Sequence, residues 1–519
     1  MAEKTLIQQE SECTVPSVII SENVESHVKP RVTRWMVVSV VTTMLGSCLP
    51  AGYCIGVINT PQEIIRSWVK SVILEKYNSE LSLTQEVSLW SVIVAIFVAG
   101  ATIGSSFGAG LADRIGRRAS LLVNHWLCIC SALLLMCCKM MGSVEMLIIG
   151  RFTSGICSGL ATCLVPLYLS EVVTAQLRGV MAVTFPLGMC LGLFISQIMG
   201  MESVLGTEYG WPYLLGGYII SVCLAIFLHP FLPESPTYCY IISHDETRGH
   251  KELSRLHGDN KYVEAEESLL RMHAKICATP QAGKTWTISR VFKFHGNKMP
   301  LIITILFNAG QQFSGINAVF YYSTLIFRSA GLNMYQSQGA SIGAGAVNCF
   351  MAILAVPLIK YCRRRVLLLT SVALCTFCQI VLMVALKLIS TSPYAPFVAI
   401  AALLSFVLVY GMGLGPVPFM IATEMFPVGP RSIGISLGGT SNWFGNLVVG
   451  LTFPLIQESL GELSFSIFIA SSFLLFIFIY KFLPETYGKE EILINQLEEE
   501  QESAEGTSTS SIEGPSYFV

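Results

Sequence analysis

Long apolar runs separated by short polar loops repeat along most of the chain. Each run is close to twenty residues long, which is the length that a helix needs to cross the hydrocarbon core of a bilayer. The pattern predicts twelve membrane-spanning helices, at residues 35–58, 88–111, 119–138, 144–169, 178–200, 211–232, 299–327, 337–359, 366–388, 396–423, 434–457 and 464–483. We therefore expect an all-α integral membrane protein.

Polar stretches before, between and after the apolar runs divide the chain further. The break after the sixth run contains helix-compatible stretches, and the last stretch is rich in Ser, Thr, Glu and Gly, a composition typical of disorder. The expected segments are a cytoplasmic N-terminal tail (1–34), an N-terminal six-helix bundle (35–232), a cytoplasmic helical linker (233–298), a C-terminal six-helix bundle (299–483) and a disordered cytoplasmic C-terminal tail (484–519).

An internal repeat supports the division into two bundles. Glu171 and Arg178 follow the fourth run, and Glu424 and Arg431 follow the tenth run, about 250 residues later. Echoes of this kind are typical of parallel halves related by an axis along the membrane normal. The repeat predicts two pseudo-symmetric bundles that face one another.

The short loops give the orientation. Arginines gather at 113–118 after the second run and at 360–365 after the eighth, with Arg178 and Arg431 on the same side. Loops rich in Lys and Arg stay in the cytoplasm. Both termini are therefore expected to be cytoplasmic, and residues 60–87 form the largest exterior segment.

The composition supports a membrane protein and removes several other classes. Of 519 residues, 53% are hydrophobic and 13% are charged, whereas soluble proteins carry about 25% charged residues. The net charge of -2 does not itself indicate a nucleic-acid partner, and no basic, aromatic-rich stretch suggests one. Most of the 17 cysteines lie inside apolar runs, where Cys behaves as a small hydrophobe. Because no metal-ligand set and no nucleophile–base pair appears, we expect no cofactor, no metal site and no enzymatic activity.

One stretch of the seventh run is far more polar than its surroundings. Residues 310–323 contain Gln311, Gln312, Asn317 and two tyrosines. Buried amides are costly in hydrocarbon unless they find partners. The stretch is therefore expected to line a polar site, and its neutral donors and acceptors suit an uncharged polyhydroxyl guest. The alternative is that these amides bond neighbouring helices together.

The tenth run contains helix breakers close together, namely Gly411, Gly413, Gly415, Pro416 and Pro418. Proline removes a backbone donor, and glycine lets a helix unwind, so nearby carbonyls need partners or a cavity. Broken helices of this kind mark binding sites and gates in transporters. The alternative is a static kink packed by neighbouring helices.

Further neutral amides lie in the eighth and eleventh runs. Asn348 is in the eighth, and Asn442 and Asn446 flank Trp443 in the eleventh. An indole can stack on the apolar face of a sugar ring while amides bind its hydroxyls. No Asp or Glu lies in the middle of any predicted helix. Since a proton-coupled carrier needs such a group, movement of the guest is expected to be uncoupled.

Charged residues at helix ends form a separate group. Arginine–carboxylate pairs can be bidentate, and they can latch one end of the bundles while the other end is open. The alternative is that these charges only anchor the topology. The expected latch residues are Arg117, Arg118, Arg151, Glu171, Arg178, Glu424 and Arg431.

Taken together, these features resemble the facilitative glucose transporter family, the animal hexose uniporters of the major facilitator superfamily. The resemblance runs from about residue 36 to residue 488. It is carried by Gly-Val-Ile-Asn at 56–59, Asp-Arg-Ile-Gly-Arg-Arg at 113–118, Gly-Arg-Phe at 150–152, Pro-Glu-Ser-Pro at 233–236, the run Gln-Gln-Phe-Ser-Gly-Ile-Asn-Ala-Val-Phe-Tyr-Tyr-Ser at 311–323, Gly-Pro-Arg at 429–431 and Ser-Asn-Trp at 441–443.

The resemblance implies roles for individual residues. Tyr321 and Tyr322 match the outer gate of the family. Phe419 stands where the family has a tryptophan and keeps an aromatic face, so it is also expected to bind substrate. Proton-coupled relatives carry an aspartate at the position of Cys54, so the likeness also implies uniport. The residues that match the family's sugar-contacting amides are Gln311, Gln312, Asn317, Asn348, Asn442 and Asn446.

Several positions depart from the family's pattern. Pro186 replaces a sugar-binding glutamine, Gly411 replaces a common glutamate, and Lys360 replaces an acidic residue of the second arginine-rich loop. Residues 308–310, Asn-Ala-Gly, stand where glucose-preferring members have Gln-Leu-Ser. Each lost hydrogen bond costs about 1 kcal/mol of sugar affinity.

The sequence thus predicts a multi-pass carrier of the plasma membrane that moves a hexose such as glucose or fructose by alternating access. The alternatives are a carrier of another polyol-like solute and a sensor that binds sugar without moving it. The expected partners are a monosaccharide and the lipid bilayer. The C-terminal residues 517–519, Tyr-Phe-Val, have a weak likeness to ligands of PDZ domains, which bind chain ends by strand addition.

Overall fold

The structure, a computed structural model, describes residues 32–485 apart from residues 79, 81, 174–176, 178–180, 182, 259–262, 265, 269, 272–273, 275–287, 294, 330 and 427. The chain divides into two compact units. One consists of residues 32–235 and 286–484, and the other of residues 1–31, 236–285 and 485–519. The larger unit contains all the long helices and is described first.

The N-terminal half of the larger unit is built of helices joined by short turns and loops. Its elements are α2 (Arg34–Thr43), η1 (Met44–Cys48), α3 (Leu49–Gly56), α4 (Gln62–Tyr77), α5 (Leu83–Ile115), α6 (Arg117–Cys137), α7 (Val144–Val172), α9 (Thr184–Met199), α10 (Trp211–Gly216), α11 (Ile219–Leu228) and η2 (His229–Phe231). The π-helical turn η1 joins α2 and α3 into one continuous span.

The C-terminal half of the same unit repeats this plan. Its elements are α14 (Ile288–Lys293), α15 (His295–Phe313), α16 (Ile316–Ser329), α17 (Met334–Tyr361), α18 (Arg364–Lys387), α19 (Ala395–Met412), α20 (Val417–Met425), α21 (Val428–Leu460), η4 (Gly461–Ser464) and α22 (Phe465–Phe482). Each of the twelve predicted spans overlaps one of these helices or a consecutive set of them. The prediction of an all-α, twelve-helix architecture is confirmed.

Not every span is equally apolar. Among the described residues, nine helical stretches are long and apolar enough to cross a membrane, and Thr184–Met199 is a shorter apolar helix. The nine do not include α15, α16 or most of α21. These are the helices that carry the amide-rich stretches, so their lower hydropathy marks the positions where the chain lines something other than lipid.

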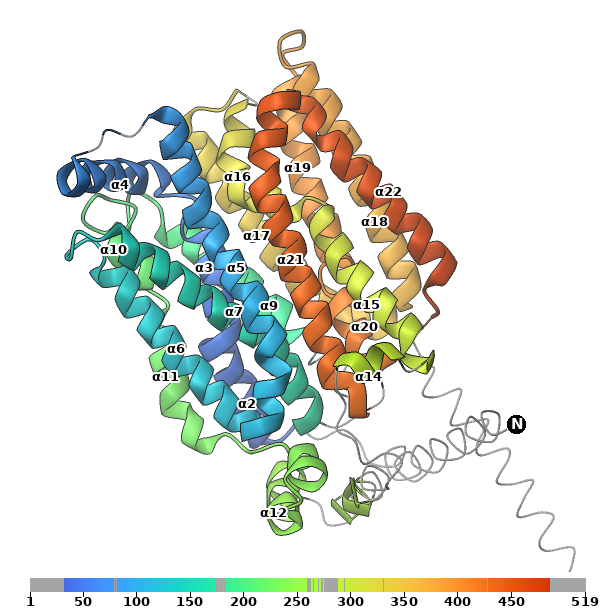
Figure 1. The fold of residues 1–519 in the computed structure, drawn as a ribbon. Coiled ribbons are helices and arrows are strands. Elements are labelled where there is room, and N and C mark those ends of the chain that lie inside the picture. The colour runs from blue at the N-terminus through green and yellow to red at the C-terminus, as the bar shows by residue number, and fades with distance from the viewer. Residues whose placement is uncertain are drawn as a thin grey trace, which may run out of the picture. The chain divides into compact units, whose positions relative to one another are not determined.

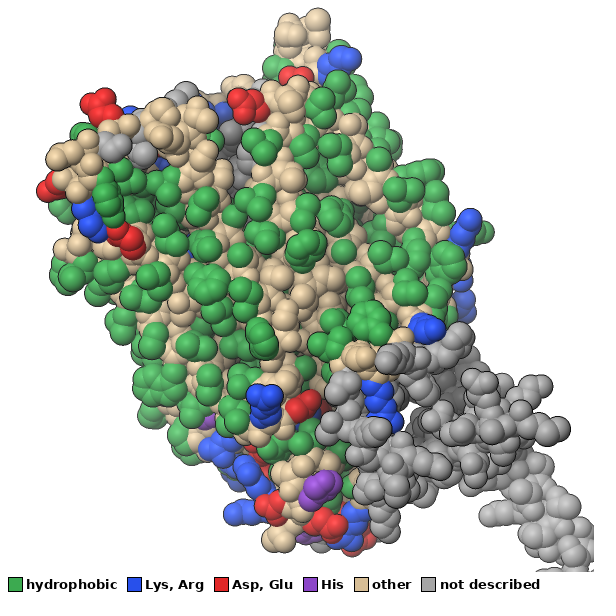
Figure 2. Space-filling model, viewed as in Figure 1, with side chains coloured by type: hydrophobic (Ala, Val, Ile, Leu, Met, Phe, Trp, Pro, Cys, Tyr) green, Lys and Arg blue, Asp and Glu red, His purple; other side chains and the backbone are tan. Residues whose placement is uncertain are grey.

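The two halves lie side by side, with α5 and α21 packed along their boundary (Figure 1). Within the N-terminal half, glycines let α5 and α7 approach closely. A Cβ at Gly100, Gly104, Gly155 or Gly159 would overlap a backbone carbonyl oxygen of the facing helix. Helices in lipid gain no hydrophobic driving force from association, so close packing, which small residues permit, stabilises such interfaces. Hydrophobic side chains cover the outer flank of the helices (Figure 2).

Short polar side chains hold the boundary between the halves. The hydroxyl of Ser436 on α21 donates to the carbonyl of Ser105 on α5, and Ser105 in turn donates to Thr440 at 3.3 Å. Nearer the arginine-rich end, Ser432 donates to Asp113 at 3.3 Å. These bonds join two elements that must separate if the cavity described below is to open at this end.

Residues 60–87, the segment predicted to be exterior, contain a helix that was not predicted from the sequence. α4 buries Ile65, Val69 and Val72 on one face, and Trp68 lies against Trp211 with ring centroids 5.0 Å apart. The spacing of these apolar residues is that of an amphipathic helix, so the signal was present in the sequence. It was overlooked because the segment is too polar to span a membrane.

The smaller unit contains η3 (Tyr238–Ile242) and α12 (Glu246–His257). Its contacts converge on the carboxylate of Glu267, which accepts from Tyr240 at 2.9 Å and lies 2.8 Å from both His250 Nδ1 and Arg271 Nη2. Burial disfavours the charged carboxylate, but these bonds outweigh burial and lower the pKa of Glu267 below its ordinary value of 4.5. The predicted N-terminal tail, apart from its last residues, nearly all of the C-terminal tail, and the PDZ-like ending at 517–519 lie outside the described residues.

Candidate functional site

The polar stretch of the seventh span is a break between two helices. α15 ends at Phe313 and α16 begins at Ile316, with Gly315 at φ +82. A side chain is disfavoured there, because a Cβ would also lie 2.8 Å from the Phe468 ring. The carbonyl of Ser314 accepts from Gln379 of α18 and that of Phe313 accepts from Ser471 of α22, both at 2.5 Å. Neighbouring helices thus satisfy the freed backbone groups, as membrane burial requires.

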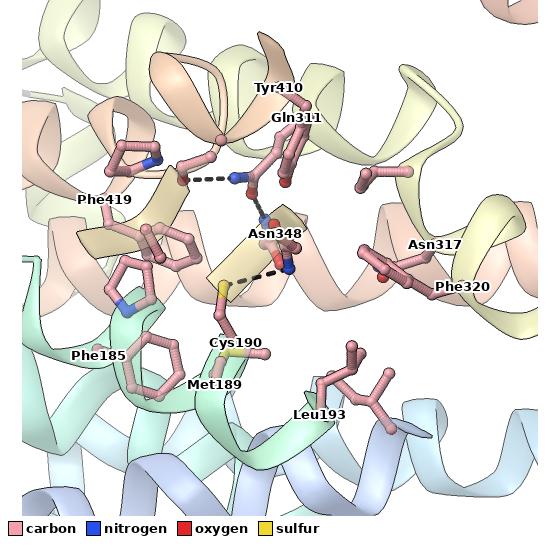
Figure 3. Close-up of a pocket in the computed structure, with 18 of the residues that line it drawn as sticks. Phe185, Met189, Cys190, Leu193, Gln311, Asn317, Phe320, Asn348, Tyr410 and Phe419 are labelled. Carbon is pink, nitrogen blue, oxygen red and sulfur yellow. Dashed lines mark hydrogen bonds between the residues drawn. The ribbon is translucent and has the colours of Figure 1, made fainter. Parts of the chain in front are cut away.

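A cavity between the two halves lies beside this break (Figure 3). It holds about 850 Å³ of space, including the part open to solvent. The structure brings all seven predicted substrate-binding residues to its wall. They are Gln311, Gln312, Asn317, Asn348, Phe419, Asn442 and Asn446.

Gln311 is bonded on both sides within the protein. Its Nε2 donates to the carbonyls of Leu414 at 2.9 Å and Gly415 at 2.7 Å, and its Oε1 accepts from Asn442. Both carbonyls belong to the break between α19 and α20. Backbone carbonyls can only accept, so they fix which way the Gln311 amide points. Both of its N–H groups are used, and none is left for a guest.

Three more amides extend the hydrogen-bonded chain from Gln311, in the order Asn442, Gln312 and Asn317. Oδ1 of Asn442 accepts from Nε2 of Gln312 at 3.1 Å, and Oε1 of Gln312 accepts from Nδ2 of Asn317. Each amide therefore accepts a hydrogen bond from the next, and the chain ends at Asn317 on α16. Among the described residues, Oδ1 of Asn317 receives no hydrogen bond. This free end, together with the second N–H of Gln312, is what the chain offers to a guest.

The break in the tenth span also has a second support. The hydroxyl of Ser371 on α18 donates to the carbonyl of Val409 at 2.8 Å and accepts from the Leu414 N–H at 3.0 Å. Ser371 and Gln311 thus replace the helical bonds that the glycines and prolines interrupt. The predicted break is present, and both the gating interpretation and the static-kink alternative fit it.

The opposite wall of the cavity is apolar. It is formed by the N-terminal half and includes Phe185, Pro186, Met189 and Leu193 of α9. Phe185 packs edge-on against Phe419 of α20, with ring centroids 5.7 Å apart. Pro186 lies where the resemblance implied a sugar-binding glutamine. This wall can therefore pack against the apolar face of a ring, while most polar contacts come from the C-terminal half.

Trp443 lines the cavity but is held in the boundary between the halves. Its indole is 2% exposed. The Nε1 group donates to Thr162 of α7 at 2.9 Å, and the ring meets Phe97 of α5 edge-on with centroids 5.9 Å apart. The sequence analysis missed this inter-half contact, because it depends on residues that are distant in the chain.

Of the expected latch, the N-terminal part forms a compact cluster. Arg117 binds Glu171 with both Nε and Nη2, at 2.8 and 2.9 Å, and it lies 3.1 Å from Asp113. Glu234 accepts from the backbone N–H groups of Arg117 and Arg118 at 3.0 Å, at the start of α6. A carboxylate at a helix N-terminus is favoured by the helix dipole. The cluster ties α5, α6 and α7 together.

The placement of Arg151 in this latch is wrong. Arg151 and Glu171 both lie on α7, and twenty residues of helix separate them by about 30 Å. Arg151 lies instead at the other end of the bundle, where its Nη1 donates to the Cys54 carbonyl at 2.7 Å and its guanidinium lies over the Phe97 ring. Sequence reasoning grouped arginines by type and overlooked the direction in which the fourth span runs.

The C-terminal half has an equivalent cluster built on a residue that the sequence analysis missed. Arg364, at the start of α18, lies 3.5 Å from Glu424 and donates to the carbonyl of Ile359. Arg117 makes the corresponding bond to the carbonyl five residues before it. Aligning the two arginine-rich loops would have identified Arg364. The Arg364–Glu424 distance is longer than the 2.8 Å distance between Arg117 and Glu171.

Four expected site residues have limited descriptions. Arg431 donates from Nε to the Phe426 carbonyl at 3.2 Å. Arg178 lies outside the described residues, and so do the side chains of Tyr321 and Tyr322. Between the two halves, Asn59 of the N-terminal half donates to the Phe320 carbonyl at 3.0 Å.

Among the described residues, no three His, Cys, Asp or Glu residues are grouped so that they could hold a metal ion. The described cavity wall also contains no Asp, Glu, His, Lys or Arg. Its polar groups are amides, hydroxyls and one thiol.

Comparison with known proteins identifies the family. Residues 38–497 match the family described as Sugar (and other) transporter. The chain is 35% identical to facilitated glucose transporter member 5 of Equus caballus over 468 residues, covering 90% of this chain and 92% of the relative. It is 37% identical to member 3 of Oryctolagus cuniculus over 459 residues, covering 88% and 91%.

Solved structures show the same fold. The major facilitator superfamily proton:xylose symporter XylE, bound to 6-bromo-6-deoxy-D-glucose, superimposes with a TM-score of 0.74 at 23% identity, covering 88% of this chain and 97% of that one. A partially occluded, inward-open form of XylE from E. coli gives a TM-score of 0.71. The sequence match covers most of both chains, and the predicted resemblance is thereby confirmed: this chain is a multi-pass membrane protein that belongs to the facilitated glucose transporter family of sugar transporters.

Proposed function

We propose that this protein moves hexoses such as glucose or fructose across a membrane by facilitated diffusion. The cavity between the two halves would open alternately to each side. The observation that carries the proposal is the pairing of an amide wall with an apolar wall in one cavity. A sugar has neutral hydroxyls on its edge and apolar C–H faces, and this pairing matches both. The relatives named facilitated glucose transporters support the same conclusion.

Transport is proposed to be uncoupled from protons. The described cavity wall contains no Asp, Glu, His, Lys or Arg; its polar side chains are amides, the hydroxyls of Thr162 and Tyr410, the indole of Trp443 and the thiol of Cys190. Cys54 occupies the position at which proton-coupled relatives carry an aspartate, and Arg151 binds the backbone carbonyl of Cys54. A coupled carrier needs a proton-binding side chain in its path.

Within the site, the amides divide into two roles. Gln312, Asn317, Asn348 and Asn446 are proposed to contact the sugar. Gln311 is proposed to hold the broken tenth span in position, because both of its N–H groups are already used. Asn442 links the two groups through its bonds to Gln311 and Gln312.

The arginine clusters are proposed to form the cytoplasmic latch. Arg117 and Arg364 occupy equivalent positions at the starts of α6 and α18, which places both clusters at the same end of the bundles. By the positive-inside rule this end faces the cytoplasm. Both termini would then be cytoplasmic, and we propose the plasma membrane as the location. Tags at each terminus, reached by antibody only after permeabilisation, would test the orientation.

The test of the site uses amide substitutions. Asn317→Ala and Gln312→Ala should each raise the KM for hexose uptake about fivefold, the equivalent of about 1 kcal/mol for a lost hydrogen bond. Gln457→Ala is the matched control, since Gln457 lies on α21, the helix of Asn442 and Asn446, but does not line the cavity. If the site variants take up hexose with an unchanged KM, the site assignment is wrong. Hexose binding without flux would favour the sensor alternative.

A further inference from the structure

One thiol faces the cavity among the described residues, and it belongs to Cys190 of α9. It lies on the apolar wall, between Met189 and Leu193. Cys54, Cys128 and Cys157 are buried together inside the N-terminal half. Cys130 and Cys223 are exposed elsewhere on the surface. Cys190 is therefore the described cysteine that a molecule in the cavity would meet.

Cys190 takes part in a contact that joins the two walls. Nδ2 of Asn348, on α17 of the C-terminal half, donates to Sγ of Cys190 at 3.2 Å (Figure 3). A thiol sulfur is a weak acceptor, whereas a hydroxyl oxygen is a good one. The amide of Asn348 thus gains little from its present partner, and a hydroxyl placed beside it would be a better one.

A second amide in the same cavity also lacks a suitable partner. Asn446 is 1% exposed, and its Oδ1 has no hydrogen bond. A buried acceptor without a donor costs about 1–3 kcal/mol. A hydroxyl can accept one hydrogen bond and donate another. A polyhydroxyl guest would therefore supply an acceptor to Asn348 and a donor to Asn446, which no apolar guest can do.

We propose that Cys190 belongs to the substrate site. In the empty carrier its sulfur accepts from Asn348, and a hydroxyl of the bound hexose replaces the sulfur as the partner of that amide. The inference rests on the proposed hexose transport. It follows that modification of the Cys190 thiol blocks the site, and that bound hexose protects the thiol from modification.

Methyl methanethiosulfonate is a suitable probe of this thiol. The Cys190 sulfur attacks the sulfenyl sulfur of the reagent, a new S–S bond forms, methanesulfinate leaves, and the thiol proton passes to water. The added S-methyl group projects into the cavity and separates Asn348 from its partner. No oxidant is needed, because the reagent itself accepts the electron pair.

The experiment uses the full chain in lipid vesicles. Treatment with the reagent should slow hexose uptake at least fivefold in the wild type. The same slowing is expected in Cys349→Ala, the matched control, because Cys349 is buried next to Asn348 in the chain and does not line the cavity. Cys190→Ala should lose this sensitivity. Peptide mass spectrometry of the wild type should show Cys190 labelling slowed at least threefold by D-glucose or D-fructose, with L-glucose as the control sugar.

Two results would overturn the inference. One is continued inhibition of Cys190→Ala by the reagent, and the other is labelling of Cys190 that neither hexose slows while uptake remains saturable. The labelling measurement needs only the wild type, so it decides the question even if the variant does not fold. Absence of hexose uptake and of hexose protection together would instead count against the proposed function.

Discussion

Replacing Gln311 by Leu separates a positioning role from a sugar-contacting role. Leucine keeps most of the volume but removes both donors to the α19–α20 break and the acceptor for Asn442. The carbonyls of Leu414 and Gly415 then lose their Gln311 partner in a buried setting. The matched variant is Gln312→Leu, the same change one position along α15, at an amide whose bonds go only to other side chains.

The magnitude follows from the two carbonyls. Each unsatisfied buried acceptor costs about 1–3 kcal/mol in soluble proteins, while side-chain hydrogen bonds measured within a membrane average about 0.6 kcal/mol. Two such losses give about 1–6 kcal/mol. A loss of about 2 kcal/mol should lower the melting temperature by about 2–4 °C, because the same loss of stability shifts the melting temperature less in a longer chain.

The assay is thermal unfolding in detergent, followed by uptake into vesicles below the melting temperature. Gln311→Leu should melt earlier than the wild type, with a change in KM smaller than that of Gln312→Leu. Gln312→Leu should raise the KM and leave the melting temperature close to that of the wild type. An unchanged melting temperature for Gln311→Leu, or a larger KM effect at Gln311 than at Gln312, would refute this reasoning.

Three further predictions concern contacts outside the amide chain. Arg117→Gln leaves Glu171 buried without its bidentate partner and should cost about 3–5 kcal/mol of stability. Arg364→Gln, at a longer and more exposed ion pair, should cost about 1 kcal/mol. Chemical denaturation of both variants measures these losses, and equal losses of stability would contradict the prediction. Phe185→Ala and Phe419→Ala should show a coupling of about 0.5–1.5 kcal/mol in a double-mutant cycle of thermal stability. If the stability losses of the two single variants add up to that of the double variant, the two rings do not stabilise one another. The pKa of Glu267 lies below its ordinary value of 4.5, so the contacts of its carboxylate are present above that pH and are lost as the pH falls through the lowered pKa. Hydrogen exchange in α12 should therefore rise below about pH 4.5 in the wild type but not in Glu267→Gln. A similar rise in both proteins would show that another group is responsible.

Local composition was sufficient to predict the helices and their breaks. Apolar runs of span length and clusters of Gly and Pro act within a few residues of one another, so the broken tenth span was evident from Gly413 to Pro416. The amides at Gln311, Gln312 and Asn317 were recognisable for the same reason, because polar groups in a hydrocarbon-spanning run need partners.

The sequence could not show which partner each polar group would find. Gln311 binds carbonyls about a hundred residues away, and Arg151 binds a carbonyl of the first span. Both assignments depend on how the helices pack. The contact between Cys190 and Asn348 is of the same kind, since neither residue type predicts the other. Such pairings are set by packing, which composition and periodicity do not contain.

The central claim is uncoupled hexose transport through the cavity between the two halves. Its most direct test is uptake of labelled glucose and fructose into vesicles containing the purified protein, with and without an imposed proton gradient. The account predicts saturable uptake that stops when the concentrations on the two sides are equal and that does not depend on the gradient. Accumulation against a sugar gradient when protons flow inward would contradict it, because the described cavity wall has no side chain suited to carrying that proton.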